Sequence, residues 1–401
     1  MAVPERTEGG RPLPRVGFVG AGQLARMCCE AASALGIDSV VLATSRDDAA
    51  VAVAGEVVLG SPHDAASLHE LAAHCDVVTF DHELVDLDMI RALEATGRPV
   101  RPSSAALEAA VDKSFQRRRF ASAGIAVPEF IVLDSDRDTD LAALHTLADR
   151  LGRVPVVKVA RGGYDGRGVV IASRLDEAAA AVAAWRESGA VVVAEAPVDF
   201  RTELAVLVAR RPGGDAVTYR AVQTTQVDGV CREILVPGGL DDATSIGAGA
   251  LAQRVAELVG AVGVMAVELF STDEGLVVNE VALRPHNSGH WTIEGATTSQ
   301  FENHLRAVLD LPLGATALTA RAVATVNVVG GPSGVLDGAS LALALCEPRA
   351  RLHLYGKAPR PGRKLGHVTV LGDDANEALE IAWRAAAALG TPVPATAGAT
   401  R

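Results

Sequence analysis

The sequence contains no long apolar run, and this absence limits where the protein can act. No stretch in its 401 residues approaches the roughly 20 apolar residues that a membrane-spanning helix needs. The N-terminus is polar and rich in proline and glycine, where a signal peptide would have an apolar core. We therefore expect a cytoplasmic protein with no membrane partner.

The sequence also has few cysteines and lacks a net positive charge. The five cysteines show no CxxC spacing, which argues against a disulfide framework and a zinc site, so we interpret them as buried apolar residues. The formal net charge of −12 argues against a nucleic acid partner. Any bound anion must then be held by selected local groups. At roughly 150 residues per domain, the length predicts two or three domains.

Lysine is the rarest of the charged residues. Only four of the 37 basic residues are lysine, namely Lys113, Lys158, Lys357 and Lys364. Arginine does not replace a compact, strongly hydrated ammonium, so lysine is expected to persist where such a point charge is needed. The alternative is chance survival on solvated faces, but all four lysines fall in or beside the segments described below.

The order of strand and helix patterns predicts an α/β protein with three lobes. Residues 15–107 alternate strand and helix, which is typical of a doubly wound domain. We place a second, larger domain at residues 108–315 and a small C-terminal lobe at 316–393. One helix, expected at 105–123, spans the boundary between the first two domains. Residues 1–14 and 394–401 are expected to be a disordered leader and tail.

The first candidate motif is GAGQLA at residues 20–25, between a strand and a helix. It matches the dinucleotide fingerprint GxGxxA, but the next strand ends in threonine where a dinucleotide site has an acidic residue. A nicotinamide-dependent dehydrogenase is therefore disfavoured. A helix N-terminus suited to a phosphate remains, with a plain tight turn as the alternative.

The second motif follows Lys158, near the end of an apolar strand, and reads GYDGRG at residues 163–168. Two apolar runs joined by a glycine-rich turn predict a hairpin. Glycines let backbone N–H groups approach phosphate oxygens while a lysine supplies charge. The motif thus predicts a lid over a nucleotide, with an ordinary hairpin turn as the alternative.

The third motif places Glu268 and Asn279-Glu280 in two apolar runs that bracket an acidic turn. If these runs form a hairpin, both carboxylates point at one site. Two carboxylates suit a magnesium ion that bridges phosphates. Solvated strand glutamates are the alternative, although an unpaired charge inside an apolar run is costly.

Two further segments carry anion-binding residue types. RPHNSGH at 284–290 combines an arginine, two imidazoles, an amide and a hydroxyl. YGKAPRPGRK at 355–364 is a Pro/Gly-rich basic loop that could clamp a phosphate, or could be a solvated turn.

At these residues the chain resembles the ATP-grasp enzymes and, within them, the N5-carboxyaminoimidazole ribonucleotide synthetases of purine biosynthesis. The match runs from about residue 15 to 388, and its most specific segments are VKVARGGYDGRG, NEVALRPHNSGHWT, SQFENHLRA and YGKAPRPGRKLGHVTV. The resemblance implies a pre-ATP-grasp domain, a central ATP-grasp domain and a small C-terminal lobe, and a homodimer is expected.

The resemblance also implies roles for individual residues. ATP would be bound by Lys113, Lys158, Gly163, Tyr164, Asp165, Gly166, Arg167, Gly168, Glu195, Ala196, Pro197, Val198, Glu203, Gln226, Asn279 and Glu280. Mg²⁺, or Mn²⁺, would lie on Glu268 and Glu280. The aminoimidazole ribonucleotide would contact Gly22, Gln23, Leu24, Glu83, Asp165, Arg284, Ser288, Lys357, Arg363 and Lys364. The residues expected to act in catalysis are Lys158 and, beside bicarbonate, Arg284, His286 and Asn287.

The chain departs from the family pattern at a few positions. The family commonly has histidine at Gln226, glutamate at Asp81 and proline at Leu283, and it has arginine or lysine at Lys113, where this chain fits the pattern. Glutamine cannot become cationic, so the pH dependence of nucleotide binding is expected to differ. Asp81 is one methylene shorter than glutamate, which could shift a contact near Glu83.

The expected reaction is attack of bicarbonate on the γ-phosphate of ATP, followed by transfer of CO₂ from carboxyphosphate to the amine of the ribonucleotide. His286 is the candidate for proton management. The alternatives are a carboxylate–amine ligase that activates formate, the dehydrogenase, and a non-catalytic nucleotide-binding regulator.

Overall fold

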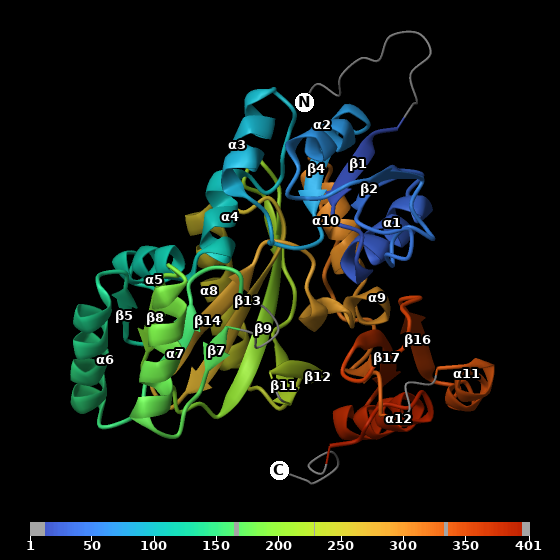
Figure 1. Cartoon of the computed structure of the whole chain (residues 1–401). Helices are drawn as coiled ribbons and strands as arrows, with labels where there is room; N and C mark the ends of the chain where they lie inside the picture. Colours follow the sequence, from blue (N-terminus) through green and yellow to red (C-terminus); the bar gives the residue numbers. More distant parts are fainter. Residues whose placement is uncertain (1–12, 164–167, 228, 333–335, 395–401) are drawn as a thin grey trace.

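The described residues form three β-sheets, which lie in the three lobes seen in Figure 1. The computed structural model describes residues 13–163, 168–227, 229–332 and 336–394. Most of the expected leader and tail, and Tyr164, Asp165, Gly166 and Arg167 of the glycine motif, lie outside the described residues. Within the described ranges, no helix combines the length and the apolar character needed to cross a membrane.

The N-terminal sheet is parallel, in the order β3 (Glu56–Leu59), β2 (Asp38–Ala43), β1 (Arg15–Val19), β4 (Val77–Phe80). Helix α1 (Gln23–Ala34) packs with one set of strand side chains, and α2 (Ala65–Ala73) and α3 (Leu87–Ala95) pack with the other. Helices on both faces confirm the doubly wound fold.

Two helices replace the single helix expected over residues 105–123. α4 (Ser104–Val111) ends at Asp112, whose backbone is extended, and α5 (Lys113–Ser122) begins directly after it. The Asp112 carboxylate accepts hydrogen bonds from the N–H groups of Ser114 and Phe115, so it caps α5. The prediction of one helix was wrong because an N-cap side chain competes with the helix backbone.

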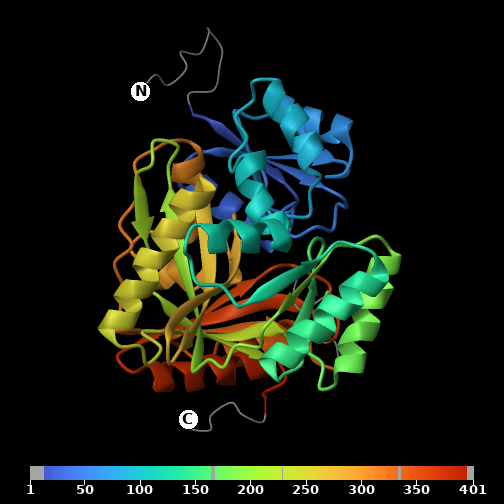
Figure 2. The same cartoon turned by 90° about the vertical axis from the view of Figure 1, so that its left-hand side faces the viewer.

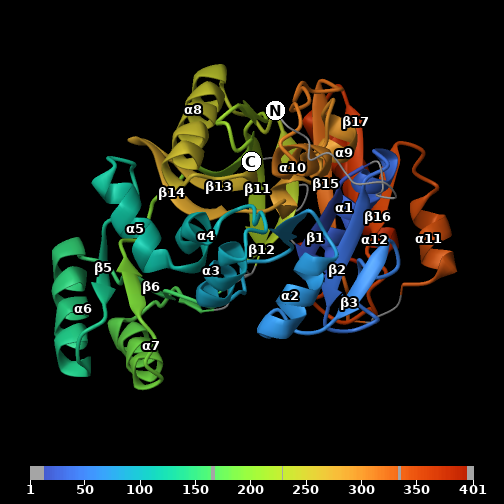
Figure 3. The same ribbon diagram turned by 90° about the horizontal axis from the view of Figure 1, so that it is seen from above.

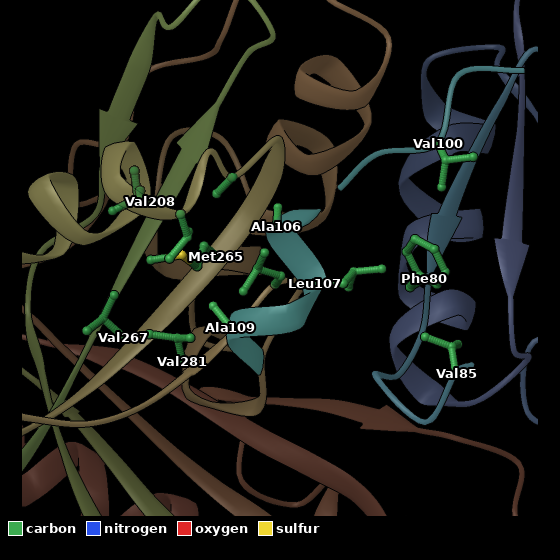
Figure 4. Close-up of a cluster of buried hydrophobic side chains, with 14 of the residues drawn as sticks. Phe80, Val85, Val100, Ala106, Leu107, Ala109, Val208, Met265, Val267 and Val281 are labelled. Carbon is green, nitrogen blue, oxygen red and sulfur yellow. The ribbon is translucent and has the colours of Figure 1, made fainter. Parts of the chain in front are cut away.

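Helix α4 joins the N-terminal domain to the rest of the molecule. In Figure 4, Leu107 lies between Phe80 of the N-terminal sheet and Met265 of the central sheet. All three side chains belong to one apolar cluster and are at most 1% exposed. The two domains therefore share a core across α4.

A small antiparallel sheet has the order β5 (Phe130–Leu133), β8 (Val192–Glu195), β6 (Val156–Val159), β7 (Val169–Val170). Helices α6 (Arg137–Leu151) and α7 (Leu175–Glu187) lie side by side along it (Figure 2). Strands β6 and β7 are antiparallel, with Lys158 opposite Val169, which confirms the expected hairpin.

The largest sheet is antiparallel and runs from the central lobe into the C-terminal lobe. Its order is β14 (Gly275–Ala282), β13 (Gly263–Thr272), β9 (Thr202–Arg210), β11 (Val222–Val227), β12 (Val230–Val236), β15 (Ala322–Val329), β17 (Lys364–Gly372), β16 (Ala350–Leu354), and β10 (Ala216–Thr218) also pairs with β9. Pairing of β12 with β15 makes the two lobes one continuous sheet, which Figure 3 shows extending from β14 toward β16.

One strand expected over residues 216–223 is interrupted. β10 and β11 both pair with β9, but three residues lie between Thr218 and Val222, whereas only two lie between their partners Val208 and Ala205. This is the count of a β-bulge. Helices α8 (Asp242–Val259), α10 (Gln300–Val308) and α12 (Ala375–Ala388) cover the large sheet, and α9 (Thr292–Gly295), α11 (Gly338–Ala344) and the 3₁₀ turn at Asn287–Gly289 connect its parts.

Candidate active site

Two carboxylates face each other on the hairpin β13–β14. Glu268 and Glu280 are register partners, so the expected hairpin over the acidic turn is present. Burial, together with the negative charges of Glu280 and Glu203, raises the pKa of Glu268 to about 8. A cation at this pair would remove the repulsion, and two carboxylates are the oxygen donors that Mg²⁺ accepts. No group of three or more metal-binding side chains occurs in the described part of the chain, so water or phosphate oxygens would have to complete the shell.

Glu203 and Gln226 lie beside this pair on β9 and β11. Burial and the charge of Glu280 raise the pKa of Glu203, while a hydrogen bond with Gln226 acts in the opposite direction. Gln226, which stands where the family commonly has histidine, thus keeps a polar contact with the candidate nucleotide residues. The carboxylates of three neighbouring strands converge on one space.

Lys158 connects the small sheet to the large one. Its Nζ lies 2.8 Å from Glu195 Oε2 on β8 and 3.4 Å from Asn279 Oδ1 on β14. Glu195 also accepts a 2.7 Å bond from Arg117 Nε, and its side chain is only 3% exposed. Burial alone would raise the pKa of Glu195, but the charges of Arg117 and Lys158 lower it to about 2.

Lys113 supplies a second cation, from the first turn of α5. Its Nζ lies 3.7 Å from Glu280 Oε2, and its backbone N–H donates to the carbonyl of Ala160 just after β6. The break at Asp112 therefore brings Lys113 beside the acidic pair. Lys113, Lys158, Asn279 and Glu280 come from three separate elements and line the same space.

The remaining residues expected at the nucleotide follow β6 and β8. Ala196, which donates its N–H to Glu129 O, begins the half-buried segment Ala196, Pro197, Val198. Gly168 has a φ of +75°, and a Cβ there would lie 2.4 Å from Val159 Cγ2. Glycine is thus required by both backbone and space at the base of the hairpin. Gly163 is described, whereas the four residues between Gly163 and Gly168 are not.

Arg284 and its neighbours sit at the end of β14, where two domains meet. Arg284 Nε lies 2.6 Å from Glu83 Oε2 of the N-terminal domain, and Leu283 N–H donates to the other oxygen at 3.2 Å. Glu83 therefore holds the segment after β14 against the N-terminal domain. Leu283 is buried, so its side chain lies in the core where the family commonly has proline.

His286 points back toward the acidic pair. Its Nε2 lies 3.4 Å from Glu268 Oε1, and its Nδ1 contacts the Ser288 hydroxyl at 2.8 Å. Burial and the charges of Arg284 and Lys364 lower the pKa of His286 to about 3, so the ring is neutral at pH 7. The Ser288 N–H also donates to Nδ1, which leaves the ring proton on Nε2. This geometry favours a neutral hydrogen-bond donor over a proton carrier.

Asn287 and Ser288 complete this corner. The Asn287 Nδ2 is buried and meets no oxygen acceptor within the residues the structure describes. Its side chain instead interacts with the Cys231 thiol, a partner that it would have to exchange for an oxyanion. Ser288 is 2% exposed and engages His286, so it acts on a ligand chiefly through that ring in the present arrangement.

The N-terminal domain contributes the glycine turn before α1. Asp81 accepts hydrogen bonds from Gly22 N–H at 2.7 Å and Ala25 N–H at 2.8 Å, so one carboxylate already occupies part of this helix N-terminus. The Leu24 side chain is buried in the core, which leaves only its backbone for a ligand. Gln23 accepts a hydrogen bond from Lys357 Nζ of the C-terminal lobe.

The basic loop of the C-terminal lobe contacts the N-terminal domain through Lys357. Lys364, the first residue of β17, is close enough that its charge acts against the raised pKa of Glu268. Arg363 donates to the carbonyl of Ala358 within the same loop. All three lobes therefore border one space.

Sequence reasoning missed two buried residues at this site, Arg117 and Gln300. Arg117 is one of three consecutive arginines, and no pattern distinguishes the buried one from its neighbours. Gln300 belongs to SQFE, a segment that the family resemblance singles out without a role. Its contact with His286 depends on tertiary structure alone.

Three family models match consecutive parts of the chain. They are a ribonucleotide synthetase preATP-grasp domain at residues 13–111, an ATP-grasp domain at 118–301 and a phosphoribosylaminoimidazole carboxylase C-terminal domain at 324–381. The chain is also 47% identical over 378 residues to the N5-carboxyaminoimidazole ribonucleotide synthase of Mycobacterium tuberculosis, covering 93% of this chain and 87% of the relative.

Solved structures agree in fold. The N5-carboxyaminoimidazole ribonucleotide synthetase of Thermus thermophilus has a TM-score of 0.82 and 36% identity, covering 94% of this chain and 99% of that one. The N5-carboxyaminoimidazole synthase of Aspergillus clavatus, in complex with ADP and 5-aminoimidazole ribonucleotide, has a TM-score of 0.84 and 31% identity, with the same coverage. The chain belongs to the N5-carboxyaminoimidazole ribonucleotide synthases, a family of ATP-grasp ligases.

Proposed function

We propose that this enzyme uses ATP and bicarbonate to carboxylate 5-aminoimidazole ribonucleotide, giving N5-carboxyaminoimidazole ribonucleotide, ADP and phosphate, in purine biosynthesis. The observation that carries the proposal is the 3.4 Å approach of His286 Nε2 to Glu268. This contact places the candidate anion-binding residues Arg284, His286 and Asn287 beside the acidic pair Glu268 and Glu280, which would hold a metal–phosphate group. A bicarbonate at those anion-binding residues would lie beside the terminal phosphate of a bound nucleotide. The ADP and ribonucleotide in the Aspergillus clavatus structure support the same substrates.

The proposed chemistry proceeds in two stages. A bicarbonate oxygen attacks the γ-phosphorus of ATP, the bond from that phosphorus to the bridging oxygen breaks, and ADP leaves with the bonding electrons. Carboxyphosphate then breaks down into CO₂ and phosphate, and the phosphate keeps the bicarbonate proton. The amine lone pair of the ribonucleotide attacks CO₂, and the nitrogen passes one proton to the released phosphate. Phosphoryl transfer of this kind needs positioning and charge stabilisation more than a covalent nucleophile.

Each residue group then has a defined task. Lys158 and Lys113 would stabilise charge on the phosphates, and Arg284 with Asn287 would bind the bicarbonate oxygens. His286 would donate a hydrogen bond from Nε2 to the same anion. Glu268 and Glu280 would hold Mg²⁺, which supplies Lewis-acid neutralisation of the phosphate charge when bound.

The ribonucleotide would lie where the three lobes meet. Its phosphate would contact the basic loop that contains Lys357, Arg363 and Lys364. Gln23 and Glu83 would contact it from the N-terminal domain. We further propose that residues 163–168 shield carboxyphosphate from water and that the enzyme acts in the cytoplasm. We also propose that it is a homodimer. Light scattering coupled to size-exclusion chromatography would measure this oligomeric state directly.

The decisive experiment measures ADP release with and without bicarbonate and with and without 5-aminoimidazole ribonucleotide. We expect fast release only with both, together with formation of one acid-labile carboxylated product. Release that depends on formate, or that ignores bicarbonate, would reject the proposal. A titration with reduced nicotinamide cofactor, followed by fluorescence, tests the dehydrogenase alternative and should show no binding.

A further inference from the structure

Lys158 shares its carboxylate partner with a second, deeper cation. Glu195 accepts from Lys158 Nζ at 2.8 Å through Oε2 and from Arg117 Nε at 2.7 Å through Oε1. Arg117 is 1% exposed, whereas the Lys158 side chain is 13% exposed and faces Asn279 in the candidate nucleotide space. The two cations thus lie on opposite sides of one carboxylate.

The Arg117 side chain does not reach the candidate nucleotide space. Its other hydrogen bonds go to Gln116 Oε1 at 2.7 Å and to the carbonyl of Asn279 at 2.6 Å, and these contacts engage Nη1 and Nη2. All three of its nitrogens are therefore used inside the protein. A direct contact with phosphate is left to Lys158.

Lys158, Glu195 and Arg117 form a charged triad, and its net charge depends on Arg117. A lysine paired alone with a buried carboxylate presents a neutral pair to an incoming anion. With Arg117 as the second partner, two positive charges face one negative charge, and the triad keeps one net positive charge. In a partly buried site this charge is weakly screened, so it acts strongly on a phosphate a few ångströms away.

We propose that Arg117 is a positioning residue that neutralises Glu195, so that the charge of Lys158 remains available to nucleotide phosphates. Its hydrogen bond to the Asn279 carbonyl also fixes the start of the Asn279-Glu280 pair. The inference rests on the proposed function, because it assigns a role at the same nucleotide site. It extends that function to a residue that touches no substrate.

The test is a charge series on the full-length enzyme, measured by calorimetric titration with ADP and magnesium chloride. Glu195→Gln raises the net charge of the triad, Arg117→Met removes it, and the double variant Arg117→Met with Glu195→Gln restores the wild-type value. We expect ADP affinity to fall about tenfold or more in Arg117→Met, to return to within about threefold in the double variant, and to rise in Glu195→Gln. The dependence of affinity on salt should follow the same order.

Arg186→Met is the matched control. Arg186 also pairs with a buried carboxylate, Asp140, at 2.7 Å, and donates to the carbonyls of Ser135 and Ala190. Its loss should lower stability while leaving ADP affinity within about twofold. Arg117→Lys, which keeps the charge but not the planar fork, should retain ADP affinity even where thermal stability falls.

Several outcomes would overturn the inference. Unchanged ADP affinity in Arg117→Met would do so, as would a double variant that binds as weakly as Arg117→Met. If Arg117→Met does not fold, Glu195→Gln and Arg117→Lys decide, because an unchanged or weaker affinity in Glu195→Gln contradicts the charge argument. Failure of the wild-type enzyme to bind ADP at all would instead refute the proposed function.

Discussion

The side-chain amide of Gln300 holds both backbone polar groups of His286. Gln300 Oε1 accepts from the His286 N–H at 2.9 Å, and Nε2 donates to the His286 carbonyl at 2.7 Å. Gln300 is fully buried, and its own N–H donates to Thr292 Oγ1 at 2.9 Å. The imidazole that faces Glu268 is therefore positioned from α10, fourteen residues further along the chain.

Replacement of Gln300 by methionine should release this clamp. Methionine fills a similar volume but leaves the His286 N–H and carbonyl without these partners. We expect kcat to fall roughly 10- to 100-fold, with a smaller change in KM for ATP, because His286 would lose its orientation. Steady-state kinetics of bicarbonate-dependent ADP release provide the measurement.

Asn303→Leu is the matched control for that variant. Asn303 lies on the same helix, is equally buried, and clamps Gly314 in the same way, through bonds to its N–H at 2.8 Å and its carbonyl at 3.2 Å. It should lose stability but keep most of its kcat. Equal losses of kcat in both variants would mean that Gln300 acts only on the fold.

The acidic pair predicts a severe effect of Glu280→Gln. Glutamine keeps the size of the side chain but removes the charge that would bind a divalent cation. Loss of metal stabilisation is worth several kcal/mol, so we expect turnover to fall by about 100-fold or more. Glu274→Gln, in the exposed turn of the same hairpin, should leave turnover within about twofold. Full turnover in Glu280→Gln would contradict metal binding by this pair, whereas intact cellular function in Glu280→Ala would support the non-catalytic regulator.

Two glycines at the base of the β6–β7 hairpin separate backbone strain from crowding. Both have positive φ, +79° at Gly162 and +75° at Gly168, but a Cβ meets nothing within 4 Å at Gly162 and lies 2.4 Å from Val159 at Gly168. Gly162→Ala should cost about 1–2 kcal/mol of unfolding free energy. Gly168→Ala should cost more and should also weaken ADP binding. Denaturant unfolding and ADP titration of both variants make the comparison, and equal effects would contradict it.

The pKa of Glu195 predicts an acid-dependent loss of stability. Its folded-state value of about 2 lies below the ordinary value of 4.5, so ionised Glu195 stabilises the fold above about pH 4.5. This contribution, ~3 kcal/mol at pH 7, is lost as pH falls from about 4.5 toward 2. The unfolding free energy of wild type should therefore drop more steeply between pH 5 and 3 than that of Glu195→Gln. Parallel curves would show that the triad does not hold Glu195 ionised.

Local patterns predicted the elements that carry most of the candidate site. The two hairpins that present Lys158 and the Glu268–Glu280 pair were predicted from apolar runs and their turns, because strand pairing across a short turn is a local property. Predictions failed where a single side chain or residue interrupts a run. Asp112 ends one helix and starts another, and one extra residue breaks the strand expected over 216–223.

Partners that are distant in sequence could not be predicted in this way. Arg117 and Asn279 are separated by 162 positions, and Glu83 and Arg284 by 201. Neither pairing leaves a periodic signal. The continuity of the large sheet through β12 and β15 was also not predicted, since edge pairing between lobes depends on how whole domains pack.

The sequence by itself determined the doubly wound N-terminal domain, the two site hairpins and the residue types available for a phosphate and a cation, because apolar periodicity and turn chemistry act over a few neighbouring residues. Only the tertiary structure decided which cations share a carboxylate, which amide orients His286 and how three lobes border one space. Those relationships arise from burial, which forces each polar group to find whichever partner the packed chain brings within reach.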